Sequence, residues 1–210
     1  VKESDDLKLA RSERASKYMQ YQLSEKMVSW RDEQDKNLMV LPCVGTSYKL
    51  SYFDYDKGEV QSDLYLANEI IFDHECSNFR DAKHVFIELD LTRNEVITFI
   101  RGIDKWDLKE DDLEEDVDSF KFIKAFTLFD IDGDGLKEPY CAIICDTTSK
   151  IVALYPYFDQ DTINRNEKDE IISVDTIDCI TQYKFLPDPA GGPMGLGWGI
   201  LFGPMFSSIN

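Results

Sequence analysis

The sequence has little positive charge and lacks the short motifs that mark common catalytic sites. Its 23 lysine and arginine residues stand against 41 aspartate and glutamate residues, which gives a formal net charge of -18 at pH 7. Binding to duplex DNA depends on lysine and arginine displacing counterions from phosphates, so a chain this acidic is not expected to grip DNA tightly. We find no Gly-x-Ser-x-Gly elbow, no Gly-Lys-Ser/Thr phosphate loop and no dinucleotide-binding fingerprint. The sequence therefore favours a protein that is not an enzyme.

Cysteines are few and show no Cys-x-x-Cys pair, and no long hydrophobic run is present. An odd number of cysteines, several within apolar runs, favours free buried thiols in a reducing compartment over disulfides. No stretch is apolar enough over a sufficient length to span a bilayer, and no signal peptide precedes the first predicted element. Both ends of the sequence interrupt a pattern, so we expect the chain to be part of a longer protein. The cysteines are Cys43, Cys76, Cys141, Cys145 and Cys179.

Histidine is also scarce, with His74 and His84 as the only two. The group His74-Glu-Cys76 has metal-binding residue types, but it lacks the second histidine at helical spacing that a zinc hydrolase needs. Both histidines are therefore interpreted as surface or hydrogen-bonded structural residues. With so many acids in the chain, some pair could always be named as an acid/base couple, and we assign none.

What the sequence does contain begins with a helical region over residues 1–45. Between Asp5 and Leu41 apolar residues recur at helical spacing, with no glycine or proline before Pro42. This pattern predicts one long helix, or a pair of helices broken near Ser24.

Residues 46–184 have the pattern of a mixed α+β domain. Segments 47–53 and 59–66 flank a turn-forming cluster and predict a β-hairpin. Thr92-Arg-Asn-Glu95 is a capping box, which predicts a short helix ending at Gly102. Nine acids between residues 104 and 118, with only two lysines, indicate a solvated loop or an exposed helix. Further strands are expected at 70–72, 84–91, 120–129, 138–145 and 151–157.

Residues 185–210 are rich in glycine and proline. Within residues 191–199 the bulky side chains Met194, Leu196 and Trp198 alternate with glycines. The segment has no Lys-Ser/Thr ending, so it is not a phosphate loop, and the pattern suits extended backbone that passes close to another backbone or subunit. The sequence as a whole predicts an α+β fold with antiparallel strands between helical ends.

The sharpest local pattern is Asp130-x-Asp132-x-Asp134-Gly135. Three carboxylates at alternate positions can converge on a hard cation such as Ca²⁺. An EF-hand loop, however, needs an acid at its twelfth position, where this chain has Cys141, and strands rather than helices are predicted on both sides. A tight Asp/Gly hairpin turn without metal is the favoured interpretation, and a calcium-dependent binding module using Asp130, Asp132 and Asp134 is the alternative.

Several short stretches, taken in order, carry a resemblance to a known family. In that order and spacing they resemble the portal proteins of short-tailed bacteriophages, in the class with a large wing region. None of them is a catalytic signature. They are Tyr18–Trp30, Leu41-Pro-Cys-Val-Gly-Thr-Ser-Tyr-Lys49, Leu91-Thr-Arg-Asn-Glu-Val96, Phe129-Asp-Ile-Asp-Gly-Asp-Gly-Leu-Lys-Glu-Pro-Tyr140, Phe185-Leu-Pro-Asp-Pro189 and Gly195-Leu-Gly-Trp-Gly-Ile-Leu-Phe-Gly-Pro204.

The resemblance implies a structural role and no cofactor. Portal subunits form a dodecameric ring at one capsid vertex, interact with capsid and scaffolding proteins during procapsid assembly, dock the terminase motor and later hold the tail adaptor. DNA passes through the ring during packaging and ejection without tight binding, and ATP hydrolysis belongs to the terminase. The resemblance places the chain in the virion after assembly in the host cytoplasm, with no membrane. It also implies that 46–184 is wing-like and that 185–210 leads toward stem helices.

Closed rings use head-to-tail contacts between two different patches of each subunit. We expect the helix over residues 5–36 and the hairpin strands to contribute to those patches.

Overall fold

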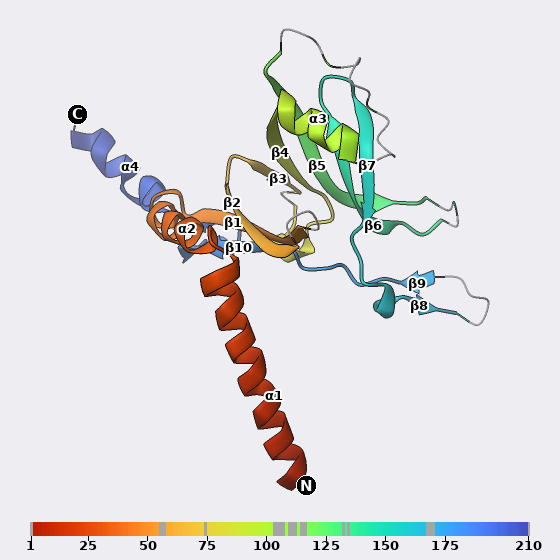
Figure 1. Cartoon of the computed structure of the whole chain (residues 1–210). Helices are drawn as coiled ribbons and strands as arrows, with labels where there is room; N and C mark the ends of the chain where they lie inside the picture. The colour runs from red at the N-terminus through yellow and green to blue at the C-terminus, as the bar shows by residue number, and fades with distance from the viewer. Residues whose placement is uncertain are drawn as a thin grey trace. The chain divides into compact units, whose positions relative to one another are not determined.

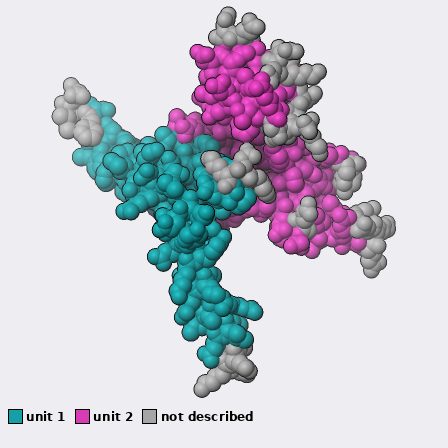
Figure 2. Space-filling view, viewed as in Figure 1, with its two compact units in different colours: residues 1–67, 179–210 teal, residues 68–178 magenta. Residues whose placement is uncertain are grey.

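The computed structural model has the predicted α+β fold, with helices and antiparallel sheets (Figure 1). The chain divides into two compact units, which are described separately: unit 1 comprises residues 1–67 and 179–210, and unit 2 comprises residues 68–178 (Figure 2). The structure describes residues 2–54, 58–73, 75–102, 108, 113, 117–131, 133, 135–166 and 171–209.

These units differ from the sequence-based boundaries after residues 45 and 184. Strand β10 (Ile180–Lys184) pairs antiparallel with β1 (Thr46–Asp54), from Thr46 opposite Lys184 to Leu50 opposite Ile180. The first hairpin and the glycine-rich end of the chain therefore share one unit. A pairing between residues so far apart in sequence leaves no local signal.

Unit 1 combines three α-helices with a three-stranded antiparallel sheet in the order β10-β1-β2. The predicted hairpin is confirmed, because β1 pairs with β2 along its length. The remaining elements of the unit are α1 (Lys2–Tyr21), a π-helical turn (Gln22–Lys26), α2 (Trp30–Val44), β2 (Glu59–Leu66), β11 (Leu186–Pro187), β12 (Gly195–Leu196) and α4 (Trp198–Ile209).

The N-terminal region forms the predicted helix pair, broken at residues 22–29 around Ser24. The second helix extends slightly beyond the predicted helical pattern, which ends at Leu41, since α2 continues through Pro42 to Val44. The helix ends at Gly45, which has the left-handed φ of 93° and donates its amide to the carbonyl of Leu41 at 2.8 Å. Glycine adopts this conformation without the penalty that a Cβ brings.

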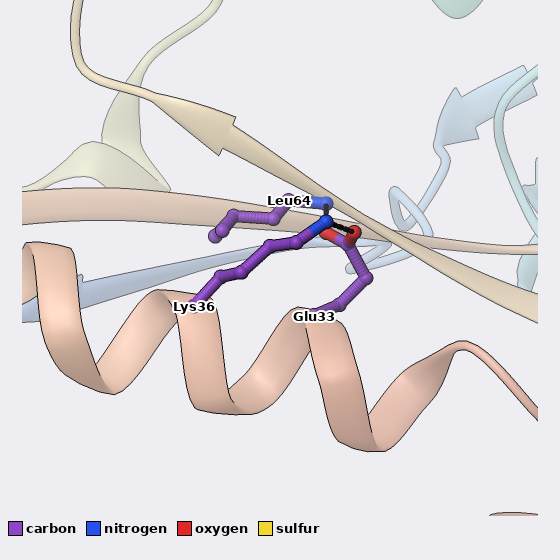
Figure 3. Close-up of polar contacts among 3 residues, drawn as sticks. All are labelled: Glu33, Lys36 and Leu64. Atoms are coloured by element: carbon purple, nitrogen blue, oxygen red, sulfur yellow. Dashed lines mark hydrogen bonds and ion pairs between the residues drawn. The ribbon is translucent and has the colours of Figure 1, made fainter.

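Polar contacts fix α2 against the sheet of unit 1. The Glu33 carboxylate accepts from the Leu64 amide on the edge strand β2 at 3.3 Å and pairs with Lys36 at 2.9 Å (Figure 3). This contact gives a partner to an edge-strand amide that would otherwise be open to pairing with another chain. Beneath the helix, the Ser47 hydroxyl donates to Asn37, and both side chains are fully buried.

A buried lysine completes the contact between α2 and β1. Lys49 is 2% exposed, and its ammonium lies 5.3 Å from the centre of the Trp30 ring and 3.2 Å from Gln34 Oε1. Burial lowers the pKa of Lys49, and the negative charge of Glu33 opposes that shift. The indole face and the amide oxygen partly replace the water that the ammonium has lost.

The start of β1 crosses the β12 segment at three glycines. A Cβ on Gly45 would lie 2.6 Å from the Gly195 carbonyl oxygen and still closer to the Gly197 amide nitrogen. A Cβ on Gly197 would lie 2.5 Å from the Cys43 carbonyl oxygen. The crossing is also hydrogen-bonded, because the Gly195 amide donates to the Thr46 hydroxyl at 2.6 Å. The glycine pattern thus marks a close approach between two backbone segments, as its spacing predicts.

Unit 2 is built on a five-stranded antiparallel sheet in the order β3-β4-β5-β6-β7. Its strands match the predicted segments and alternate as expected, with Ile87 buried and Glu88 and Asp90 exposed on β4. The unit also contains a 3-10 turn (Phe79–Asp81) and a second one (Gln160–Thr162). Its other elements are β3 (Ile70–Phe72), β4 (Val85–Thr92), α3 (Arg93–Gly102), β5 (Ser119–Phe129), β6 (Glu138–Cys145), β7 (Lys150–Pro156), β8 (Asn164–Arg165) and β9 (Ile171–Ser173).

The core of unit 2 lies between α3 and one face of this sheet. Val96 of α3 and Phe122 of β5 are both fully buried there. Leu108 and Leu113 belong to the same core, although they come from the acidic segment that was expected to be solvated. Most of residues 104–118 lie outside the described part of the chain, but Leu108 and Leu113 contribute apolar side chains to the core.

The capping box forms at the start of α3, with one difference from the expected geometry. The Glu95 carboxylate accepts from the Thr92 backbone amide at 2.8 Å, as predicted. The Thr92 hydroxyl, however, donates to the same carboxylate at 2.8 Å. The pKa of Glu95 is lowered mainly by the hydrogen bond from the Thr92 amide and, to a smaller extent, by the hydrogen bond from the Thr92 hydroxyl.

This lowered pKa predicts a pH-dependent contribution to stability. A carboxyl whose pKa is lower in the folded state stabilises the fold above its unfolded pKa, and the contribution is lost as pH falls through the folded value. Glu95→Gln keeps an acceptor but removes the charge, so it should lower the free energy of unfolding near neutral pH. The difference should shrink below pH 4.5, the ordinary value for the group. Urea denaturation at several pH values tests this, and a difference independent of pH would contradict it.

Candidate functional site

The Asp130 loop has the contacts of a hairpin turn between β5 and β6. Asp130 Oδ1 accepts from the Gly133 amide at 2.7 Å, and its Oδ2 accepts from the Gly135 amide at 3.1 Å. Both glycines have positive φ, at 77° and 94°, as tight Asp/Gly turns require. These bonds give each oxygen of Asp130 a backbone partner within the turn. Asp132 and Asp134 lie outside the described residues, so the calcium site remains a prediction.

The other candidate metal ligands are dispersed. Within the part of the chain that the structure describes, no three His, Cys, Asp or Glu side chains are grouped to hold an ion. His84 Nδ1 contacts the Thr127 hydroxyl and is half-buried, while His74 is outside the described residues. The five cysteines are free thiols, of which Cys141 and Cys145 are buried and Cys43 is exposed.

Helix α4 is the most unusual surface element of unit 1. None of its residues, from Trp198 to Ile209, is charged. Its start is fixed by the glycine crossing and by an edge-to-face contact between the rings of Phe185 and Trp198, whose centres are 5.6 Å apart. Aromatic pairs of this geometry add stability beyond the area they bury. The helix is therefore held at its first turn by its own unit.

Along its length, α4 nevertheless leaves large apolar side chains in solvent. Ile200 and Met205 are each 60% exposed. Helix α2, which packs beside α4, adds further exposed apolar residues. We call this set the α4 surface; it consists of Leu38, Met39, Val44, Trp198, Ile200, Leu201, Phe202 and Met205.

The α4 surface has the chemistry of a contact region. A helix that is apolar on all sides is normally buried, and contiguous exposed apolar patches mark sites of association. Sequence patterns did not identify 198–209 as a helix, because Gly199, Gly203 and Pro204 all disfavour helical structure. The absence of charged residues between Trp198 and Ile209 is the sequence signal that could have marked this segment as a contact surface.

Helix α1 is a second element with little packing in its own unit (Figure 1). From Asp6 to Tyr21 every side chain is exposed except Ala10, which is half-buried. Most of the stability of a protein helix comes from packing one face against other elements. Two helices of unit 1 thus present surfaces suited to a partner.

Comparison with known proteins adds no further assignment. Within the described ranges, no helix has both the length and the apolar character needed to cross a bilayer. The chain matches no protein-family model and no curated protein.

Proposed function

We propose that this chain is a structural subunit of a bacteriophage portal ring, the conduit for DNA packaging and ejection. The observation that carries the proposal is the α4 surface, in which the uncharged helix α4 leaves Ile200 and Met205 each 60% exposed. Exposed apolar surface of this kind is typical of a site that another subunit covers. The order of sequence segments that resembles portal proteins supplies the identity of the assembly.

The proposed ring is built by head-to-tail contacts. In a closed cyclic assembly each subunit offers one patch to the neighbour on one side and a different patch to the neighbour on the other. The α4 surface provides one apolar patch for such a contact. In this proposal the ring also docks the terminase and the tail adaptor, as portal rings do.

The charge of the chain supports a conduit rather than a DNA-binding protein. A net charge of -18 repels phosphates, so DNA would move past this surface without being held. The proposed role accordingly needs no catalytic residue in the chain and leaves ATP hydrolysis to the motor.

Negative-stain electron microscopy of the protein encoded by the whole reading frame tests the proposal. We expect rings with a central hole. Monodisperse particles without rings, over a range of protein and salt concentrations, would overturn it. Images at low and high salt serve as the internal control, because an apolar contact survives salt that screens surface charges.

A further inference from the structure

Helix α1 carries a positively charged stripe in which two arginines lie between apolar side chains. Residues 7–21 include four basic residues and one acid, Glu13, which gives a net charge of +3. One side of the helix is formed by residues that follow one another at alternating spacings of four and three, a pattern that places them in a line. These are Leu7, Arg11, Arg14, Tyr18 and Tyr21, and Lys8 and Lys17 flank them.

This stripe has no complement within the described part of its own unit. Leu7 is 59% exposed and Tyr18 is 60% exposed. Tyr18 accepts a hydrogen bond from Gln22 of the adjoining turn. Among the described residues, neither Arg11 nor Arg14 forms a hydrogen bond or ion pair. The stripe therefore offers two unpaired guanidinium groups beside exposed apolar side chains.

An acidic element of opposite character lies in unit 2. Most of the negative charge of the chain is there, since residues 68–178 hold 12 basic and 28 acidic residues, a net charge of -16. Residues 158–166 and 171–178, which we call the acidic arm, hold one basic and four acidic residues, a net charge of -3. The arm contains the two-stranded ribbon of β8 and β9, which is separate from the five-stranded sheet (Figure 1).

The acidic arm is only partly packed within its own unit, through contacts such as the edge-to-face pair of Phe158 with Tyr140. None of its described side chains is buried, and Ile172 and Ile177 are 60% and 47% exposed. Isolated two-stranded ribbons are marginally stable, so such a ribbon gains from being covered. Asp161 and Asp175 are exposed, and among the described residues their carboxylates form no hydrogen bond or ion pair.

We propose that the basic stripe of α1 docks on the acidic arm of a second copy of this chain, forming a head-to-tail interface. Guanidinium groups of Arg11 and Arg14 meet carboxylates of the arm, while Leu7 and Tyr18 cover exposed isoleucines. The interface deepens the proposed function, on which it rests for its place in a ring. A second copy of the chain is the partner that fits, because its acidic arm offers both negative charge and exposed apolar side chains to the basic and apolar stripe.

The two patches are distinct, so one copy can use its stripe and its arm at the same time. That is the requirement for a contact that repeats around a ring. Duplex DNA would match the charge of the stripe but offers nothing for Leu7 or Tyr18. The net charge of the whole chain would also oppose its approach.

A charge-reversal exchange tests the interface in the 210-residue chain. One variant carries Arg11→Glu and Arg14→Glu, the other Asp161→Lys and Asp175→Lys, and self-association is measured by analytical ultracentrifugation at low salt. Each variant alone should associate about tenfold more weakly than the unsubstituted chain, or worse, because like charges then face each other. An equimolar mixture should recover association, since every contact between the two different variants pairs opposite charges. A chain with all four substitutions should recover it too.

The control variant carries Ser12→Glu and Ser16→Glu, which add two carboxylates on the side of α1 opposite the stripe, and it should associate as the unsubstituted chain does. Circular dichroism verifies that every variant keeps its helix content. An unsubstituted chain that stays monomeric, or a mixture that associates no better than its components, would overturn the interface. Loss of association in the Ser12→Glu, Ser16→Glu variant would also overturn the interface. If the stripe instead contacted the arm of the same copy, mixing the two charge-reversal variants would not restore association.

Two further readouts separate the alternatives. If the chain binds labelled duplex DNA and loses that binding with Arg11→Glu and Arg14→Glu, while self-association is unchanged, the stripe is a nucleic-acid site and the proposal fails. Rings that still form in the whole protein with those two substitutions would overturn this interface and leave the proposed function intact. Failure of the unsubstituted protein to form rings overturns the function, whereas the exchange experiment reports on the interface alone.

Discussion

Replacing Gly45 by alanine should destabilise unit 1 by about 4 kcal/mol or more, at the upper end of the range for single substitutions. Gly45 has φ of 93°, and the left-handed region costs an L-residue about 1–2 kcal/mol. The new methyl group would also lie 2.6 Å from the Gly195 carbonyl oxygen and closer still to the Gly197 amide. Both neighbours are backbone, so neither can move as a flexible side chain would. Urea denaturation followed by circular dichroism measures the loss.

Two other glycines provide matched controls for this substitution. Gly58 also has positive φ, at 68°, but no atom of the described residues lies within 4 Å of its added Cβ, so Gly58→Ala reports the backbone strain. Gly203 lies within α4, where an added Cβ has no described atom within 4 Å and φ is not positive. Gly203→Ala should therefore be neutral or stabilise the helix by about 0.5–1 kcal/mol. If Gly45→Ala costs no more than Gly58→Ala, the crossing is loose and the clash is not real.

The parts of the fold that could be predicted are those with a local signal. The β1–β2 hairpin follows from two strand patterns around a turn, and the start of α3 follows from the capping box at Thr92 and Glu95. The addition of β10 to β1 could not be predicted, because the pairing of Tyr48 with Gln182 joins distant segments. Leu108 was missed for a similar reason, since it stands in an acidic run and becomes buried only when α3 and the sheet come together.

The candidate surfaces divide in the same way. The alternating glycines around Leu196 indicated a close backbone approach, which the crossing with Gly45 provides. Helix α4 escaped prediction because its glycines and Pro204 disfavour a helix, although the first turn is held by tertiary contacts with Phe185 and the crossing. Tertiary packing overrides weak intrinsic propensity in such cases. Which side chains of α4 remain exposed depends on the packing of the folded unit, whereas the absence of charge is visible in the sequence.

Two carboxylates on the α4 surface should abolish ring assembly without unfolding the chain. Ile200 and Met205 are each 60% exposed, so aspartate at both positions stays hydrated in the separate subunit and its free energy of unfolding should change little. In the proposed ring the same carboxylates would be buried against an apolar neighbour, where each costs several kcal/mol. We therefore expect Ile200→Asp with Met205→Asp to weaken subunit association by at least about a hundredfold, a factor that corresponds to roughly 2.8 kcal/mol.

The measurement is the fraction of ring particles in electron micrographs, with sedimentation to count free subunits. Ile131→Asp is the control, because Ile131 is 52% exposed on the β5–β6 turn of unit 2 and the substitution makes the same chemical change outside the α4 surface. Rings should persist in that variant. The salt dependence of association distinguishes the two contacts proposed for the ring. High salt screens the charges of the α1 interface and weakens it, whereas the apolar contact at α4 is little affected. Rings as abundant in the double aspartate variant as in the unsubstituted protein would show that α4 faces solvent in the assembly.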